Sequence, residues 1–542
     1  MKKFFPAAVL ALTAACVTAQ AARNKAAARL PQYDLTIELL PDSRRAEVSG
    51  TWRLPPAAEG RTQIEFYLSS KMERLEVRLL EPQASAPLTL LSTKAEGGDT
   101  KWIFRPAAPV PAGQPVRLQF SYSSDDKPAP QFNISPEGSF AGGGGELWYP
   151  QTSHSDRESG TLRFRVPAGE LVVSNGKLQS AAGQRAKGEF VFQVTQPSKF
   201  GFASGKYTIL RKPGGVPFAL YLLRPSAHAQ EILDGCARAL NFLTRLFGPF
   251  PYQEFSLVEV DFRSRVRGTG EFGFILADVS EFERGFDLSY WAHELGHQWW
   301  GNLVRSRAGT SGRMMLSEGI TQFGALRAVE AIEGAAAAER FRRSGYHTSG
   351  TGQSAASYFR LAAAGKDLPL TAHEPKSQDD ILSMHALANS KGFILLDMLS
   401  RRIGRERFAS ILKSFIRQKA NQTTSWQDFR RAVEAGAGQD VRWFFEQWFE
   451  RPGAPDYQLS WEVERGRVRG RVTQTAPHYR VALEVEIRGR GRSVLRTVEI
   501  VGERATFDWP VPFEVESVIL DPHYKTLRWT PGYRSRTAAG SN

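Results

Sequence analysis

Two histidines lie four positions apart in the segment His293-Glu294-Leu295-Gly296-His297. Residues i and i+4 share one face of a helix, so both imidazoles can bind the same metal ion. Zinc lowers the pKa of a bound water molecule to about 7, and a neighbouring carboxylate can then take up its proton. The pattern predicts one Zn²⁺ per chain, with His293 and His297 as ligands and Glu294 as general base. The alternative is a pair of surface histidines on a helix.

A catalytic zinc ion needs a third protein ligand and one open coordination position. Glu318 is the candidate, because it lies at the start of an apolar, helix-periodic stretch and can point out of the first turn. The alternative interpretation is a carboxylate that only interacts favourably with the helix dipole. Glu330 is a poorer candidate, because it lies about three turns further along the same helix.

The elements that would position these residues show helical periodicity. Apolar residues recur at i, i+3 and i+4, as in helices with one buried face, within residues 232–246, 288–304, 318–332 and 391–403. Residues 255–262 have the pattern of a strand. Pro452 ends the last helix, since proline cannot continue one. We therefore expect a mixed catalytic domain over residues 213–452.

The flanking regions have strand periodicity. Residues 33–39 alternate between apolar and polar side chains, and Ser174-Asn175-Gly176 is typical of a hairpin turn. These patterns predict an N-terminal β domain over residues 22–212. Short alternating strands return over residues 453–532, which predicts a small β-sandwich, followed by a polar tail at 533–542. The expected fold class is multidomain α+β.

The N-terminus has the pattern of a targeting signal. A basic start, an apolar stretch and Ala19-Gln20-Ala21 predict a signal peptide over residues 1–21. We expect export to the periplasm or the cell exterior, and no transmembrane helix, because no other apolar run is long enough to span a bilayer. A lipid anchor on Cys16, giving a membrane-associated lipoprotein, is the minor alternative. Cys236, the second of two cysteines, is expected to be buried and inert.

Composition excludes several classes of protein. The 542 residues are 42% hydrophobic and 23% charged, which excludes wholesale disorder, collagen and a coiled coil. The net charge of +14 is spread along the chain, and the arginines at 465, 467, 469 and 471 have the spacing of a solvated strand face. We expect no nucleic-acid partner. A basic surface suits an anionic envelope or acidic peptides.

The sequence resembles the aminopeptidase N family of gluzincin zinc metallopeptidases, as a short exported member of bacterial type. The similarity lies in the strand at 33–40, the turn at 172–176, the zinc helix, Lys391-Gly392, and the segments 444–448 and 453–455. It implies an N-terminal β-saddle, a thermolysin-like α/β catalytic domain and a C-terminal β-sandwich. It also implies that His293, His297 and Glu318 bind zinc and that Glu294 is the base.

Two departures from the family pattern are mild. Twenty residues lie between His297 and Glu318, two more than usual, which a longer loop over residues 305–313 explains. The family binds the substrate's free amine through the glutamate of a Gly-x-Met-Glu-Asn segment. Here that segment is Gly268-Thr269-Gly270-Glu271-Phe272. The resemblance therefore implies amine binding by Glu271, with Gly268 and Gly270 beside it; the alternative is a solvated residue at a strand end.

The third departure concerns the oxyanion. The family has a tyrosine donor two residues before its Lys-Gly pair, and Asn389 occupies that position. The Asn389 amide can donate, but losing one oxyanion donor typically costs about 10²–10³ in rate. His385, Tyr346 and Tyr358 are alternative donors, although an ordinary helix histidine is the simpler interpretation of His385.

Two functions follow from these residues. The first is an exported zinc metallopeptidase that releases N-terminal residues from peptides or proteins. The second is a zinc-containing peptide-binding pseudo-peptidase whose catalysis is impaired because the expected tyrosine is Asn389. The oligomeric state and the preferred side chain are not determined by the sequence.

Overall fold

A computed structural model describes residues 30–529 except 83–87, 97, 144, 154–156, 264–266, 308 and 348–357. The chain divides into two compact units, Met1–Leu233 with Tyr252–Gly285 and Asp234–Pro251 with Phe286–Asn542. Each unit is described by itself, and the domain boundaries predicted at 212 and 452 stay predictions. The predicted signal peptide, Cys16 and the tail at 533–542 lie outside the described residues.

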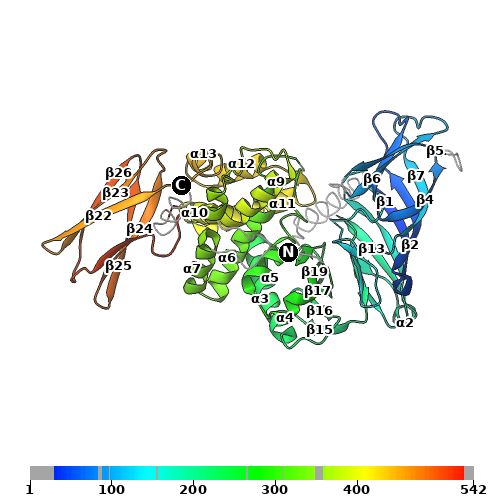
Figure 1. Cartoon of the computed structure of the whole chain (residues 1–542), viewed down its shortest axis with the longest axis horizontal. Coiled ribbons are helices and arrows are strands. Elements are labelled where there is room, and N and C mark those ends of the chain that lie inside the picture. Colours follow the sequence, from blue (N-terminus) through cyan, green and yellow to red (C-terminus); the bar gives the residue numbers. More distant parts are fainter. Residues whose placement is uncertain are drawn as a thin grey trace, which may run out of the picture. The chain divides into compact units, whose positions relative to one another are not determined.

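The first unit is built from β-sheets (Figure 1). Strand β1 (Gln32–Leu40) pairs in parallel with β10 (Glu158–Arg165) and antiparallel with β2 (Arg45–Leu54). Alternate residues of β1, from Tyr33 to Leu39, are buried, as the sequence predicted. The seven-stranded sheet has the order β12-β13-β10-β1-β2-β7-β4. Its remaining strands are β12 (Lys177–Leu178), β13 (Glu189–Ser198), β7 (Val116–Ser124) and β4 (Met72–Glu81).

Two smaller sheets belong to the same unit. One has the order β3-β6-β5 and the other β11-β14-β9-β8. The first consists of β3 (Ile64–Ser69), β6 (Asp99–Pro106) and β5 (Leu88–Glu96). The second consists of β11 (Leu171–Ser174), β14 (Phe202–Gly205), β9 (Ser139–Ala141) and β8 (Phe132–Asn133).

The hairpin predicted at Ser174-Asn175-Gly176 is wrong, because the strands on either side of this turn belong to different sheets. Asn175 is completely buried. Its Nδ2 donates to the carbonyl of Phe272 at 3.3 Å and its Oδ1 accepts from the backbone N–H of Gly201 at 2.6 Å. These distant partners hold the turn, so it links two sheets instead of closing one hairpin.

A mixed sheet follows in the order β15-β16-β17-β19-β18. Its strands are β15 (Thr208–Lys212), β16 (Phe218–Leu222), β17 (Phe255–Val260), β19 (Phe274–Asp278) and β18 (Gly268–Gly270). β16, β17 and β19 are parallel, and every residue of β17 is buried. Burial of all six residues, including the polar Ser256 and Glu259, is typical of a strand that is covered on both faces of a parallel sheet. The predicted strand over 255–262 is confirmed, although it ends at Val260.

The second unit places the zinc motif on a short helix. Helix α5 (Leu288–Gly296) begins at Asp287, whose carboxylate accepts from the N–H groups of Ser289 and Tyr290. The sequence predicted a helix as far as residue 304, but α5 ends at Gly296. The chain turns there, because Gly301 has a φ of 105° and Trp300 pairs with Val304. A positive φ is open to glycine at little cost.

The partner helices contain two π-helical turns. The first, η2 (Met315–Gly319), runs directly into α6 (Ile320–Ile332). The second, η3 (Ala388–Gly392), joins α9 (Gln378–Leu387) to α10 (Phe393–Ile403). Both therefore interrupt longer helices, and π-helical turns of this kind occur frequently at functional sites.

The other helices of this region are α3 (Ala229–Phe247), α7 (Ala335–His347), α8 (Tyr358–Ala363), α11 (Arg405–Lys419), α12 (Trp426–Gly436) and α13 (Arg442–Trp448). Helix α4 (Val279–Glu283) belongs to the first unit. Cys236 in α3 is buried, as predicted, and burial raises its thiol pKa. In the described part of the chain, no helix combines the length and apolar character needed to cross a bilayer.

Two three-stranded sheets end the described chain, in the orders β22-β23-β26 and β25-β24-β27. Their strands are β22 (Tyr457–Glu464), β23 (Arg467–Gln474), β26 (Arg504–Pro510), β25 (Arg492–Ile500), β24 (Val481–Gly489) and β27 (Ser517–Leu520). Arg467 and Arg469 form ion pairs with Asp508 on the neighbouring strand. The arginine row is therefore a strand face paired with acidic residues.

Candidate active site

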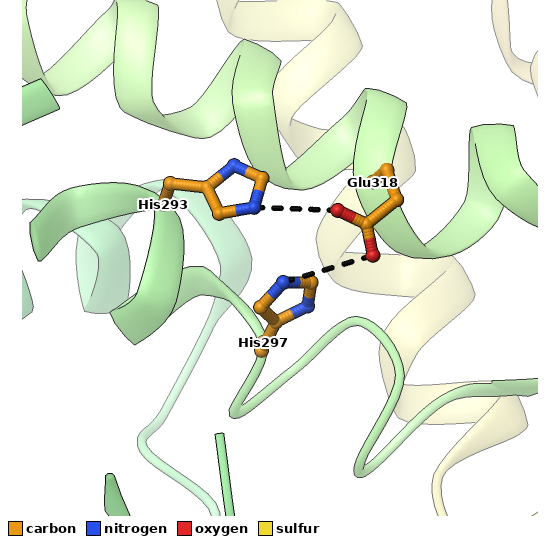
Figure 2. A group of neighbouring side chains, drawn as sticks. All are labelled: His293, His297 and Glu318. Atoms are coloured by element: carbon orange, nitrogen blue, oxygen red, sulfur yellow. Dashed lines mark ion pairs between the residues drawn. The ribbon is translucent and has the colours of Figure 1, made fainter. Parts of the chain in front are cut away.

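Three predicted metal ligands come together from α5 and η2. Nε2 of His293 lies 3.3 Å from Oε2 of Glu318, and Nε2 of His297 lies 3.8 Å from Oε1 (Figure 2). All ligand atoms of the group lie within 4.8 Å of one another. Figure 2 shows both imidazoles pointing toward the carboxylate of the neighbouring helix.

The geometry and the donor set fit zinc. Two atoms that each bind zinc at about 2.0–2.1 Å in a tetrahedron are about 3.3 Å apart. The separations of 3.3 and 3.8 Å between imidazole nitrogens and Glu318 oxygens are close to this value. Two imidazoles and one carboxylate also match a catalytic zinc site, which keeps one position open. The predicted cofactor therefore suits the residues that the fold brings together.

Each ligand imidazole is held through its other nitrogen. Nδ1 of His293 lies 2.7 Å from Oε1 of Gln322, and Nδ1 of His297 lies 3.1 Å from the carbonyl oxygen of Trp300. Because both partners are acceptors, each Nδ1 donates to its partner, which leaves Nε2 as the nitrogen that can bind the metal. Gln322 was not among the residues predicted from the sequence. Its position four residues after Glu318 was the available signal.

Met315 packs the two π-helical turns together. A Cβ atom on Gly319 would lie 2.6 Å from Cε of Met315, and one on Gly392 would lie 2.5 Å from its Sδ. Both distances are too short for a Cβ atom, so only glycine at these two positions leaves room for the buried thioether of Met315. This packing brings η3 next to the turn that carries Glu318.

Asn389 and His385 both reach Glu318. Nδ2 of Asn389 donates to Oε2 at 3.2 Å, and Nε2 of His385 lies 3.4 Å from the same oxygen. Burial alone would raise the pKa of Glu318, but the charges and hydrogen bonds of the histidines hold that pKa well below its usual range. Burial opposes the charge of His385, yet Glu318 and Glu294 raise its pKa. Glu294 itself is buried.

Glu271 belongs to the first unit. It follows β18, which contains Gly268 and Gly270, and both of its carboxylate oxygens lie 3.1 Å from the backbone nitrogen of Gly143. Burial raises its pKa to about 7, against the hydrogen bonds of Gly143 and Thr269 and the charge of Arg157. Glu271 is therefore a buried carboxylate and not a solvated strand end, and its role in amine binding stays a prediction.

The remaining candidates have other partners. The Tyr358 hydroxyl donates to Oδ2 of Asp367 at 2.7 Å. Glu330 forms ion pairs with Arg327, Arg342 and Arg405. The side chain of Tyr346 lies outside the described part of the chain. Glu318, not Glu330, thus accompanies the two histidines.

The site has the ligand arrangement of a catalytic metal centre, with two imidazoles and one carboxylate. Residues 285–448 match the Peptidase family M1 domain. Residues 285–448 therefore carry the similarity to this peptidase family, in agreement with the predicted resemblance to the aminopeptidase N family.

Known relatives match part of the chain. Aminopeptidase N of Lactococcus lactis subsp. lactis is 29% identical over 167 residues, which are 30% of this chain and 18% of that protein. Aminopeptidase M1-C of Oryza sativa subsp. japonica is 24% identical over 245 residues, or 42% of this chain and 26% of that protein. The matched regions thus span about a fifth to a quarter of the relatives' length.

The fold extends beyond these matches. The crystal structure of a mutant M1 zinc metallopeptidase from Deinococcus radiodurans superimposes with a TM-score of 0.61 at 17% sequence identity. It covers 79% of this chain and 95% of that one. The predicted multidomain α+β fold is therefore confirmed.

Proposed function

We propose that this protein is a zinc-dependent aminopeptidase that releases N-terminal residues from peptides or proteins. The observation that carries the proposal is the convergence of His293, His297 and Glu318, with each histidine held through Nδ1 so that Nε2 can bind the metal. The family membership of residues 285–448 supports it.

Bound zinc supplies Lewis acidity, which polarises the scissile carbonyl and acidifies the attacking water. Glu294 accepts a proton from this water as its oxygen bonds to the carbonyl carbon. The same carboxyl group then delivers the proton to the departing nitrogen as the C–N bond breaks. The products are an amine and a carboxylic acid, which releases the second proton of the water to the amine or to solvent. A single carboxylate that takes up and returns one proton is therefore enough for the bond cleavage itself.

Glu271 is proposed to bind the substrate's free amine. A buried ammonium group needs a paired carboxylate, and Glu271 is buried with an oxygen next to the backbone of Gly143. Gly143 and Gly201 lie so close to this carboxylate that a Cβ atom on either would contact it. A carboxylate that binds the free amine would select substrates with an unblocked N-terminus.

The central test compares wild type with Glu294→Gln on aminoacyl reporter substrates, with and without a chelator. We expect turnover in wild type only, lost with the chelator and restored by zinc. Glu330→Gln is the matched control, since Glu330 lies in an ion-pair network. Chelator-insensitive turnover that is equal in wild type and Glu294→Gln would refute the proposal.

The alternative function is a zinc-containing peptide-binding protein with negligible turnover. The hydrogen bond from Asn389 to Glu318 favours this alternative. An amide that donates to a proposed metal ligand is not available to donate to the substrate. Measurable peptide affinity without hydrolysis would support this alternative, and so would an Asn389→Tyr variant that gains activity. Efficient hydrolysis by wild type would reject it.

We also propose export through the predicted signal over residues 1–21, with a lipid anchor on Cys16 as the minor form. Cell fractionation and the N-terminal sequence of the mature protein test this. A mature protein that begins after Ala21 in the periplasm or medium is expected. A full-length cytoplasmic protein would contradict export, and a lipidated Cys16 would establish the minor form.

A further inference from the structure

A third imidazole, that of His385, lies beside the proposed metal ligands, but its hydrogen bonding differs from that of His293 and His297. Its Nε2 is 3.4 Å from Oε2 of Glu318. Nδ1 of both His293 and His297 is bound by an acceptor, whereas Nδ1 of His385 makes no hydrogen bond among the described residues. His385 is also absent from the described group of mutually close metal-ligating atoms. Among the described residues, hydrogen bonding therefore holds this ring through Nε2 alone.

His385 is the most accessible of these side chains. It is 28% exposed, against 14% for His293, 18% for His297 and 13% for Glu318. A group that meets a substrate has to be reachable from solvent, whereas one that only supports a ligand does not.

Asn389 is less suited to contact substrate. Its residue is only 7% exposed, and its Nδ2 is used by Oε2 of Glu318. A short amide bound to a ligand carboxylate orients that carboxylate, in the manner of other groups that surround metal ligands. Within the described residues, His385 is then the side-chain donor nearest to Glu318 that also remains accessible.

We propose that His385 donates the hydrogen bond that stabilises the oxyanion formed on the scissile carbonyl oxygen, while Asn389 orients Glu318. This inference rests on the proposed peptidase function. As water adds to the carbonyl carbon, the π electrons move onto the oxygen, and the Nε2–H of His385 turns from Glu318 to that oxygen. The proton stays on His385, and the carbonyl re-forms when the C–N bond breaks.

The experiment measures binding, not only turnover. A phosphinic pseudopeptide carries tetrahedral, anionic oxygens like those of the transition state, and a donor to the oxyanion should favour it over a planar peptide. Its Kd is measured for zinc-loaded wild type, His385→Leu and His385→Gln. The Kd of an uncleaved peptide is measured in the Glu294→Gln background, and zinc affinity by competition with a chelator. His373→Gln is the control, because His373 contacts Asp380 in the first turn of the same helix, α9.

We expect His385→Leu to weaken pseudopeptide binding about 10²-fold, the usual effect of losing one oxyanion donor. His385→Gln, which keeps an N–H donor, should recover part of this loss and also serves if the leucine variant fails to fold. Zinc affinity and peptide affinity should change little, and His373→Gln should resemble wild type. Unchanged pseudopeptide binding in both His385 variants would overturn the inference.

Two further outcomes separate the possible failures. If zinc affinity falls about 10–100-fold, the role of His385 is to orient Glu318, and the inference is wrong. If wild type binds zinc but neither hydrolyses peptides nor binds the pseudopeptide, the proposed function fails and the inference falls with it. An active wild type whose His385 variants bind normally refutes the inference alone.

Discussion

Lys391 and Asp367 form an ion pair in which the lysine side chain is completely buried. Nζ of Lys391 lies 3.2 Å from Oδ1 of Asp367 and donates to the carbonyl of Gly453 at 3.0 Å. Oδ2 of Asp367 accepts from the Tyr358 hydroxyl and from the backbone of Gly453, each at 2.7 Å. The pair therefore ties η3, which carries Asn389, to the start of the linker that leads to the C-terminal sheets.

Removing the ammonium group should destabilise the second unit. Lys391→Met leaves Asp367 without its cation in a buried place, which costs about 3–5 kcal/mol. The free energy of unfolding from urea titration measures this. The matched control is Lys366→Met, because Lys366 pairs with Asp379 at the surface and such pairs are worth about 0–1 kcal/mol. Equal effects of the two changes would contradict the prediction.

Gln322 should control zinc affinity without contacting the metal. Gln322→Ala removes the acceptor that holds Nδ1 of His293, and losing such a partner typically costs about 10–100-fold in metal affinity. Competition with a chromophoric chelator measures it. Gln418→Ala, on the exposed face of α11, should leave the affinity unchanged. A Gln322 variant that binds zinc like wild type would show that the imidazole needs no support.

Zinc should stabilise the folded protein only when Glu318 is present. A ligand that binds the native state at 100 times its Kd adds about 2.7 kcal/mol to the free energy of unfolding. We expect added zinc to raise the melting temperature of metal-free wild type and of Glu330→Ala, but not of Glu318→Ala. Differential scanning calorimetry checks this, and a full shift in Glu318→Ala would exclude Glu318 as a ligand.

Glu271 should make stability depend on pH. Its folded-state pKa of about 7 lies above the ordinary value of 4.5, so the folded state holds the proton more tightly than the unfolded state. The contribution is complete below pH 4.5 and is lost as pH rises through about 7. The shift of about 2.5 pKa units corresponds to about 3 kcal/mol.

The measurement compares metal-free wild type with Glu271→Gln in urea at pH 5 and pH 8. The stability of wild type relative to the variant should fall by about 2.5 kcal/mol over this interval, because the contribution is not yet complete at pH 5. The control is Glu189→Gln, an exposed residue of β13 that should show no such change relative to wild type. A constant difference between wild type and Glu271→Gln would show that Glu271 ionises alike in both states.

Local patterns in the sequence determined much of this protein. The alternation of residues 33–39 predicted β1, the strand pattern of residues 255–262 predicted β17, and the spacing of His293 and His297 predicted a shared metal. These features depend on the periods of single strands and helices, which a chain carries within a few residues. Glu318 was predicted from its position at the start of a helix-periodic stretch and the domain ranges from strand and helix periodicity, and the family resemblance supported both.

Tertiary packing alone decided the surroundings of the metal site. Asn389 meets Glu318 across 71 positions of the sequence, because Met315 fits between Gly319 and Gly392 and holds two π-helical turns together. Asn175 likewise links two sheets through distant backbone groups, where the local pattern predicted a hairpin. Such contacts depend on how separate elements pack, and no short-range period in the chain encodes that arrangement.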